Sequence, residues 1–473
     1  MRTVPRNRRA VVIGSGPNGL SAAIVLAQAG LAVEVFEAQE IPGGGARTLP
    51  LTLPGFHHDF GSAVHPMAVA SPFFNSLPLG EHGLQWIHGD APLAHPLDDG
   101  TAVILERNLN DAAAAFGEDG PAWRRLLEPV VDHFREFAAD SLGPLVRIPR
   151  HPFLMGRFGL AAFQPAQGLA DKHFRNPRTR ALFAGLAAHS FLRMDQPLSS
   201  AVGLVLAAAA HSVGWPIPRG GAQAITNALL AELSRHGGKV HTSNRISSLD
   251  DFADAVTLAD ITPRQLLDIA ADRLKPAYRQ SLDRYLYGPG AFKIDFALSS
   301  PIPWKAAECS RAITVHVGGS FEEIANAEAA VSLGVHPERP FVLVAQPTIY
   351  DGSRAPQGCH IAWAYCHVPN GSTLDVSAEI EAQVERFAPG FGDCVLARHT
   401  SSPATLESMD ENLVGGDING GALTLSQFLF RPGIHNYATG TPGLYLCSSS
   451  TPPGGGVHGM CGYHAAKLAL RKL

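Results

Sequence analysis

The sequence predicts an α/β fold in which a Rossmann-type domain is interrupted by a mixed α+β domain. A strand, a glycine-rich turn and a helix open the chain, and a second apolar strand ending in an acid follows. A further glycine-rich turn precedes the last helix. The 473 residues suffice for two or three domains, and 45% of them are hydrophobic, which allows a large core. The net charge of −5 and the absence of a basic block argue against nucleic-acid binding.

The first strand, residues 11–13, runs into a turn with glycines at positions 14, 16 and 19. Gly14 permits a sharp turn, Gly16 lets the backbone approach a pyrophosphate, and Gly19 lets the helix of residues 20–29 pack on its strand. The helix N-terminus offers free N–H groups to phosphates. We therefore expect Gly14, Gly16, Pro17, Asn18 and Gly19 to bind a dinucleotide.

The second strand, residues 31–36, ends at Glu37 and Ala38. A carboxylate at this point accepts hydrogen bonds from ribose hydroxyls and disfavours a 2′-phosphate. The expected ligand is therefore FAD or NAD rather than NADP, with both residues in contact with it.

A second cofactor-binding segment is expected just after this acid. Residues 42–48 contain consecutive glycines, of which Gly44 and Gly45 suit close backbone approach to a flat cofactor, and Arg47 can bond its phosphate or a carbonyl edge. Residues 55–66 then predict a short strand and a turn in which Gly61 and Ser62 approach the same ligand.

The middle of the chain alternates between helical and strand-rich sequence. Helices are predicted at 110–116, 121–141, 179–188, 198–212, 224–236 and 377–388, and strands at 239–242, 255–260, 291–298, 312–317, 341–346 and 361–367. The apolar run 201–210 is too short to span a bilayer and predicts a buried helix. We assign residues 1–76, 214–290 and 405–473 to a discontinuous cofactor-binding domain, and residues 77–213 and 291–404 to a substrate domain.

The end of the chain predicts a buried strand, a glycine-rich loop over 454–459 and a helix from residue 461. A second helix N-terminus reached through glycines can bind phosphate or neutralise negative charge on a flavin. We expect Ser450, Gly456, Val457, His458 and Gly459 to contact the cofactor, so that both ends of the chain build one site.

Taken together, these segments resemble the superfamily of FAD-dependent phytoene desaturases and amine oxidases, and within it the phytoene dehydrogenase-like branch. The resemblance also includes residues 187–197, 214–223 and 421–432. It implies a GR2-type flavoprotein fold with bound FAD, with Gly14 to Glu37 on the ADP half, Gly44 to Arg47 at the pyrophosphate and flavin, and Gly456 to Gly459 beside the isoalloxazine. Two departures stand out: residues 240–263 are shorter than in relatives, and three serines occupy 448–450 where relatives often carry glycines.

The candidate catalytic residues are His65, Tyr365 and His458. His65 follows a turn expected near the flavin, and His458 lies within the last glycine loop. Trp363 and Tyr365 share one strand face, and with Phe428 they are candidate walls of a substrate pocket. The alternatives are hydrogen-bonded structural histidines and ordinary aromatic core packing. His57 and His58 point to opposite faces of a strand, so we expect no metal site there.

The expected function is oxidation of an apolar or alicyclic small molecule, in which hydride transfer to flavin N5 creates a C=C bond and oxygen or a quinone takes the electrons. An amine oxidase, a non-redox flavin-dependent isomerase and a non-catalytic flavin-binding protein are the alternatives. Six cysteines without CxxC spacing fit a reducing cytoplasm. Peripheral membrane contact and a homodimer are left open.

Overall fold

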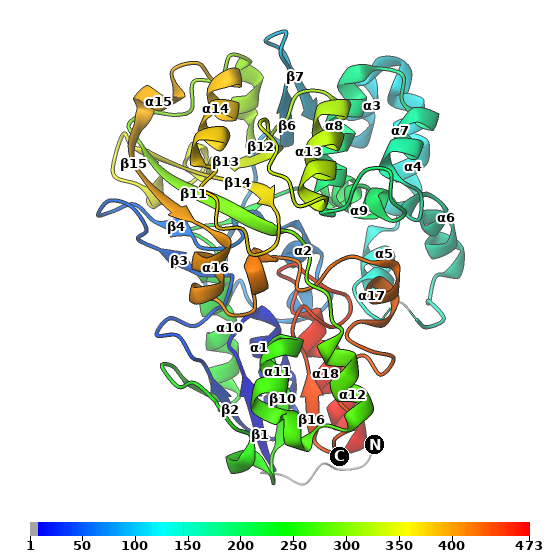
Figure 1. Cartoon of the computed structure of the whole chain (residues 1–473), viewed down its shortest axis with the longest axis vertical. Helices are drawn as coiled ribbons and strands as arrows, with labels where there is room; N and C mark the ends of the chain where they lie inside the picture. The colour runs from blue at the N-terminus through cyan, green and yellow to red at the C-terminus, as the bar shows by residue number, and fades with distance from the viewer. Residues whose placement is uncertain (1–7, 145) are drawn as a thin grey trace.

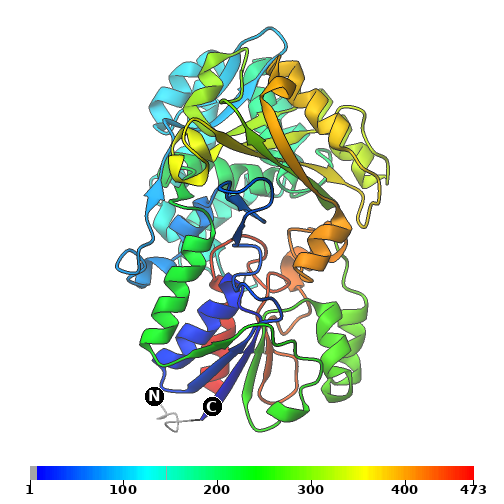
Figure 2. The ribbon, with the colours of Figure 1, turned by 90° about the vertical axis from the view of Figure 1, so that its left-hand side faces the viewer.

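The computed structural model describes residues 8–144 and 146–473, and it contains two main sheets stacked along the long axis of the molecule (Figures 1 and 2). The lower sheet in Figure 1 is parallel and has the strand order β16-β10-β1-β2-β9. Its strands are β1 (Arg9–Ile13), β2 (Ala32–Phe36), β9 (Lys239–His241), β10 (Val256–Ala259) and β16 (Leu444–Leu446). Strands from the beginning, the middle and the end of the chain thus pair in one sheet, which confirms the predicted Rossmann-like core.

Both faces of the parallel sheet are buried, as a parallel sheet requires. Val12 packs on one face against α1 (Pro17–Gln28), α10 (Gln223–Arg235) and α18 (Met460–Lys472). The alternating residues Val11 and Ile13 pack on the other face against α11 (Pro263–Ala270) and α12 (Pro276–Asp283). Helices α1 and α18 approach closely because Gly462 lacks a side chain: a Cβ there would lie 1.8 Å from the Asn18 carbonyl oxygen.

The upper sheet has seven strands in the order β15-β11-β14-β13-β12-β6-β7 (Figure 1). All neighbouring pairs are antiparallel except β12 with β6, which is parallel. The strands are β6 (Ala91–Pro96), β7 (Ala102–Leu105), β11 (Gly290–Leu298), β12 (Ala312–Val317), β13 (Val342–Ala345), β14 (His360–Val368) and β15 (Val395–Ser401). Phe292 and Ile294 pack beneath α14 (Ser377–Phe387) on one face, so the opposite face is free to border a site.

Helices between β7 and residue 213 flank this sheet. They include α3 (Leu109–Ala115), α4 (Gly120–Val131), α5 (Phe134–Ser141), α6 (Pro152–Ala162), α7 (Ala166–His173), α8 (Pro177–Ala188) and α9 (Ser199–Ser212). The buried helix predicted over 198–212 is confirmed as α9. The single helix predicted over 121–141 is wrong: it breaks between α4 and α5, where His133 has φ −124° and ψ 37°. Pro129 weakens α4 just before this break because it cannot donate to the Arg125 carbonyl.

Several elements have no clear sequence signal. Strand β15 carries polar residues at the sheet edge, and helices α13 (Phe321–Ser332), α16 (Pro403–Met409) and α17 (Leu425–Phe430) lie between predicted segments. Two short pairs, β3 (Thr48–Leu49) with β4 (His58–Asp59) and β5 (Trp86–Ile87) with β8 (Ile217–Pro218), connect the two halves. These elements depend on partners that are distant in sequence.

Candidate functional site

A cavity of about 630 Å³ lies between the carboxyl edge of the parallel sheet and the free face of the mixed sheet. The floor of the cavity is formed by the glycine turn that follows β1, by Glu37 after β2 and by Asp260 after β10. In an open parallel sheet, ligands usually bind at the carboxyl ends of the strands, at the point where the strand order reverses. The structure therefore brings the two ends of the chain and the inserted sheet to one site.

The floor begins with the turn between β1 and α1. Gly14 has φ +92° and donates to the Phe36 carbonyl at 2.8 Å. A Cβ on Gly19 would lie 2.1 Å from the Gly14 carbonyl oxygen, so only glycine allows this turn. The N-cap residue of α1 is Gly16, which has no side chain to cap the helix, and the first turn of α1 contains no acid. The turn itself therefore leaves the helix N-terminus open toward an anion in the cavity.

Glu37 borders the cavity at the end of β2, where the sequence predicts it. Its Oε2 accepts hydrogen bonds from the Ser15 amide at 2.9 Å and the Ser15 hydroxyl at 2.6 Å. Its Oε1 accepts from the Gln39 amide at 2.9 Å. These bonds fix the carboxylate beside the glycine turn, and each oxygen retains lone-pair capacity for a further donor.

Asp260 is a floor residue that sequence reasoning missed. It follows β10, is almost fully buried, and its Oδ2 accepts a hydrogen bond from the Gly19 amide at 2.8 Å. Burial raises the pKa of Asp260 to about 7, and the neighbouring Asp410 and Glu37 carboxylates act in the same direction. Its position after a short apolar strand and before Pro263 was the available signal.

The glycine loop after β2 forms the side of the cavity. A Cβ on Gly45 would meet no atom within 4 Å, and Gly45 borders the cavity, so its missing side chain leaves space for a ligand. A Cβ on Gly61 would lie 2.4 Å from the Gly45 carbonyl oxygen. Arg47 is buried, donates to the Gly44 and Met409 carbonyls at 2.7 Å each, and lies over the Phe60 ring.

The roof of the cavity is one face of the mixed sheet. Lys293 pairs with Tyr365 across β11 and β14, and Tyr365 pairs with Leu343 of β13. The two-residue period of a strand places Trp363 on the same face as Tyr365. The Trp363 and Tyr365 rings stand nearly perpendicular, with centroids 5.1 Å apart. The roof residues that line the cavity are Ala291, Lys293, Thr314, Leu343, Trp363 and Tyr365, with His189, Leu206 and Trp215 from adjoining helices.

Lys293 is the one charged side chain among these roof residues. It forms a buried ion pair with Asp295, and its Nζ lies 5.7 Å from the centre of the Trp363 ring. Burial lowers the pKa of Lys293 and raises the pKa of Asp295 to about 6. Sequence reasoning missed this pair because two residues on one strand face become partners only when the surrounding sheet excludes water.

Two histidines border the cavity and are kept neutral. Burial lowers the pKa of His65 to about 4 and that of His189 to about 3. His189 Nε2 lies 3.0 Å from Nε2 of His316. Within the described part of the chain, His65 Nε2, Asn18 Oδ1 and Thr314 Oγ1 are buried at the cavity without a hydrogen-bond partner. Such atoms are available to a ligand.

The loop before α18 supplies the remaining wall. Gly456 and Val457 line the cavity. The predicted residues Ser450, His458 and Gly459 of the same segment, and Gly19 of the first turn, are not among the lining residues. His458 Nδ1 accepts from the Met460 amide at 3.1 Å, and its carbonyl accepts from Ser71 at 2.6 Å. Phe428 does not border the cavity and instead contacts Phe163 with ring centroids 6.2 Å apart.

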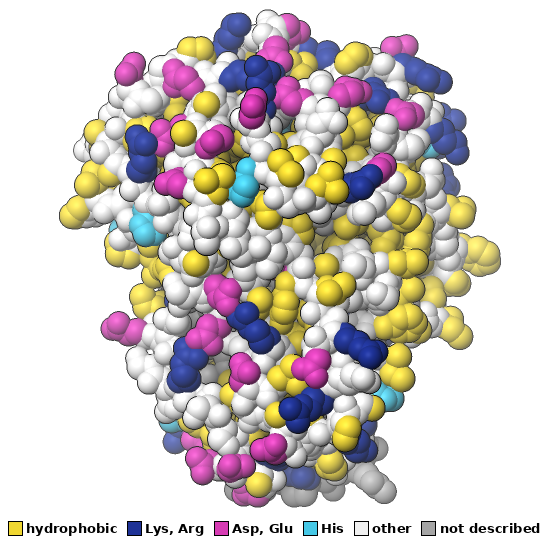
Figure 3. Space-filling view, viewed as in Figure 1, with side chains coloured by type: hydrophobic (Ala, Val, Ile, Leu, Met, Phe, Trp, Pro, Cys, Tyr) yellow, Lys and Arg dark blue, Asp and Glu magenta, His cyan; other side chains and the backbone are white. Residues whose placement is uncertain are grey.

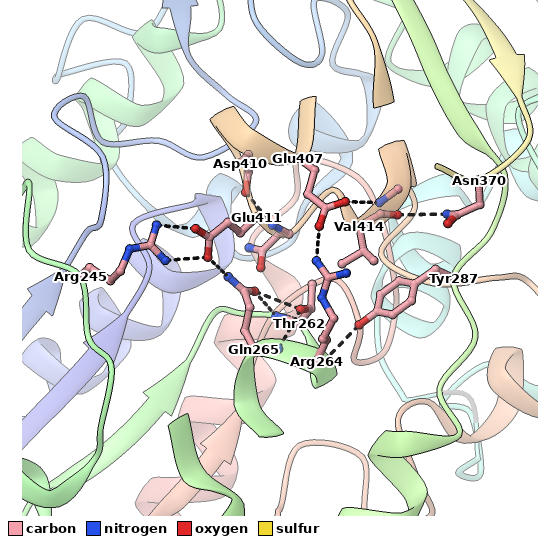
Figure 4. Close-up of polar contacts among 12 residues, drawn as sticks. Arg245, Thr262, Arg264, Gln265, Tyr287, Asn370, Glu407, Asp410, Glu411 and Val414 are labelled. Atoms are coloured by element: carbon pink, nitrogen blue, oxygen red, sulfur yellow. Dashed lines mark hydrogen bonds and ion pairs between the residues drawn. The ribbon is translucent and has the colours of Figure 1, made fainter. Parts of the chain in front are cut away.

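A polar network closes the side of the cavity near Asp260 (Figure 4). Glu411 pairs with Arg245 and accepts from Gln265 at 3.0 Å, and Asn412 donates to the Asp260 carbonyl at 3.0 Å. Arg264 pairs with Glu407 beside it. The network therefore connects α11 beneath the cavity with the segment that follows α16.

The lining residues fit a flavin dinucleotide. The uncapped α1 N-terminus and Gly16 suit a pyrophosphate, Glu37 suits a ribose, and the space beside Gly45 suits a flat ring. The predicted residues Gly14, Gly16, Pro17, Asn18, Glu37, Ala38, Gly44, Gly45, Arg47, Gly61, Ser62, Gly456 and Val457 all line this one cavity. Their contacts with FAD stay a prediction.

Residues 12–77 match the family described as NAD(P)-binding Rossmann-like domain. The chain is 27% identical to pyridine nucleotide-disulfide oxidoreductase domain-containing protein 2 of Mus musculus, over 98% of this chain and 93% of that protein. It is 25% identical to a neurosporene-forming phytoene desaturase of Rhodobacter capsulatus, over 96% and 92% of the two chains. A structure of putrescine oxidase with three substitutions matches with a TM-score of 0.62 and 15% identity, over 99% of both chains. The resemblance to the FAD oxidoreductase superfamily and the α/β fold class are thereby confirmed.

Proposed function

We propose that this chain is an FAD-dependent oxidoreductase that dehydrogenates an apolar, uncharged small molecule. The observation that carries the proposal is the cavity itself. Its floor has the features of a dinucleotide site. Its roof is mainly apolar and aromatic, with Lys293 as the one charged side chain and no acid among the roof residues named above. A flavin, when bound, supplies a hydride acceptor at N5.

The chain's own residues would hold the cofactor and exclude water. Glu37 would accept from the ribose, Gly14 and Gly16 would receive the pyrophosphate, and Gly45 and Val457 would border the ring. The aromatic roof would press an apolar substrate against the ring and keep water away from the reacting carbon.

His65 is the candidate base for the hydrogen that leaves the substrate as a proton, while the other leaves as a hydride. It is buried and neutral, and its Nε2 is free of hydrogen bonds among the described residues. A neutral imidazole at this position can accept a proton at Nε2. His189 is the second neutral imidazole on the cavity wall, which makes it the matched comparison.

Amine oxidation is the second candidate, because the fold resembles putrescine oxidase and Trp363 and Tyr365 form an aromatic pair. Two observations favour the uncharged substrate. The rings meet edge to face rather than as two parallel walls. No acidic side chain lines the roof to pair with a cationic amine, since the nearby Asp295 carboxylate is already paired with Lys293.

The test is anaerobic mixing of the flavin-loaded protein with apolar alkenes, alicyclic hydrocarbons and amines. We expect bleaching of the flavin absorbance with an uncharged substrate, and a His65→Gln variant with normal flavin content to reduce its flavin roughly 10²-fold more slowly. Ammonia release with an amine would support amine oxidation. Turnover that needs prior dithionite reduction would support an isomerase, and a protein without flavin would end the proposal.

A further inference from the structure

Helix α6 is apolar but only partly buried. Its sequence, PFLMGRFGLAA, has one charged residue, Arg157, and Ala162 is its one buried residue. Helix α17 also contains no buried residue, although its sequence is LSQFLF. A surface helix normally buries its apolar stripe against the core. In α6, one side packs on the helical core through Leu154, Met155, Phe158 and Ala161. Phe153 and Leu160 of α6, and Leu425 and Phe430 of α17, remain exposed.

These helices form one surface. Phe163, which follows α6, contacts Phe428 of α17, with ring centroids 6.2 Å apart. We call this surface the apolar platform and define it by its exposed side chains: Val146, Ile148, Phe153, Leu160, Phe163, Leu425, Phe430 and Ile434. The most exposed are Phe153 at 92% and Ile148 at 91%. Figure 3 shows hydrophobic side chains gathered on the right side of the molecule, over α6 and α17.

The exposed charged side chains between residues 141 and 170 are all basic, and one of them, Arg147, pairs with the buried Asp140 at 3.6 Å. Between Asp140 and Asp171 the sequence contains three arginines, Arg147, Arg150 and Arg157, and no acidic residue. All three are exposed. The sequence after Asp417 also has no aspartate or glutamate, although the whole protein has a net charge of −5. Acidic residues are thus excluded from both segments that build the platform.

We propose that the apolar platform docks on the surface of an anionic phospholipid bilayer. Apolar side chains beside arginines are the arrangement that inserts into the headgroup region while the guanidinium groups meet phosphates. No helix in residues 8–144 and 146–473 is long and apolar enough to cross the bilayer, so the contact is peripheral. A second copy of the chain is the competing occupant, but a twofold contact would bring these arginines toward their equivalents.

The platform adjoins the cavity through the segment that follows Asp417. Ile418 lines the cavity and is 36% exposed, and the same segment continues into α17. A docked protein would take an apolar molecule from the bilayer without moving it through water. This consequence rests on the proposed function, whereas the docking itself does not.

The experiment is co-sedimentation of the full chain with phosphatidylcholine vesicles, with and without phosphatidylglycerol. We expect binding to the anionic vesicles, weaker binding without phosphatidylglycerol, and loss of binding at about 0.5 M salt, where charges are screened. Phe153→Glu/Leu160→Glu should lower the partition coefficient about tenfold or more. Leu333→Glu/Val335→Glu changes two side chains of similar exposure outside the platform, and it should bind like the wild type.

Circular dichroism and flavin absorbance, measured on each variant, separate misfolding or a failed cofactor assignment from a failed docking proposal. Equal vesicle binding by the two double variants would overturn the proposal. Absence of wild-type binding would overturn it as well. In that case, dissociation of a wild-type dimer by Phe153→Glu/Leu160→Glu in sedimentation velocity would assign the platform to a second copy.

Discussion

The Asp260 carboxylate lies directly beneath the first glycine turn, where its Oδ2 accepts a hydrogen bond from the Gly19 amide at 2.8 Å. A Cβ on Gly16 would lie 2.8 Å from the same oxygen. This acid therefore fixes the turn that the sequence assigns to the pyrophosphate. It also places a titratable group at the cavity floor.

Replacing Asp260 with Asn should remove a pH dependence of stability. The folded-state pKa of Asp260 is raised to about 7 by burial, so the folded protein holds this proton more tightly than the unfolded chain. The resulting stabilisation is complete below about pH 4 and is lost as the pH rises to about 7. The free energy of unfolding of Asp260→Asn, relative to wild type, should therefore rise over this interval by ~4 kcal/mol at most. Urea unfolding of the flavin-free wild type and variant at several pH values measures this difference in the free energy of unfolding. A difference that does not change with pH would contradict the prediction.

Replacing Glu37 with Ala should weaken flavin retention. The variant loses a ribose acceptor and leaves the Ser15 amide without its carboxylate partner. We expect a loss of roughly 1–3 kcal/mol in FAD binding, measured as the flavin-to-protein ratio and by titration of the flavin-free protein. Glu34→Ala is the control, since Glu34 lies on the same strand, pairs with Arg9 and is absent from the cavity lining. Undiminished flavin in Glu37→Ala means that the ribose is placed elsewhere.

Breaking the buried Lys293–Asp295 pair should destabilise the roof. Lys293→Met leaves the Asp295 carboxylate buried without its cation, and we expect a loss of about 3–5 kcal/mol in the free energy of unfolding. Lys293→Met/Asp295→Leu removes both charges and should recover most of that loss. Chemical unfolding of both variants and the wild type under the same conditions compares their free energies of unfolding. A double variant as unstable as the single one would show that packing, not charge, dominates this site.

The Arg245–Glu411 pair should act on the cofactor more than on the fold. Both side chains are partly exposed, so Arg245→Gln should change the free energy of unfolding by less than about 1 kcal/mol. Because the pair closes the side of the cavity, flavin should dissociate several-fold faster, as followed by fluorescence after dilution. Arg124→Gln removes an exposed pair with Glu128 away from the cavity, and it serves as the control. Equal dissociation rates in both variants would contradict a closing role.

The sequence predicted the floor of the site better than its roof. Gly14, Gly16 and Glu37 form a local pattern, because one turn and the strands on either side of it must satisfy short-range steric rules. The structure places them at one cavity. Asp260 and Lys293 carried no such signal, since their neighbours come from strands that are hundreds of residues apart or from a sheet that buries them.

Trp363, Tyr365 and Phe428 show what sequence spacing can predict and what depends on tertiary packing. The two-residue spacing of Trp363 and Tyr365 predicted a shared strand face, and both line the cavity. Phe428 had the same aromatic character but lies against Phe163, because helix α17 packs beside α6 rather than over the cavity. The residue type tells which contacts a side chain can make, but the packing of its helix or strand decides whether that side chain points into the cavity.

By itself, the sequence determined the α/β class, the turn geometry at Gly14 and the buried helix over 198–212, since these depend on residues close in the chain. Tertiary structure alone decided that Asp260 lies under Gly19, that Lys293 lies over Trp363 and that one side of α6 stays exposed. Each of these depends on which distant surfaces pack together and exclude water. Exclusion of water raises the pKa of the Asp260 carboxyl group and lowers that of the Lys293 ammonium group, whereas Phe153 and Leu160 of α6 remain in contact with water.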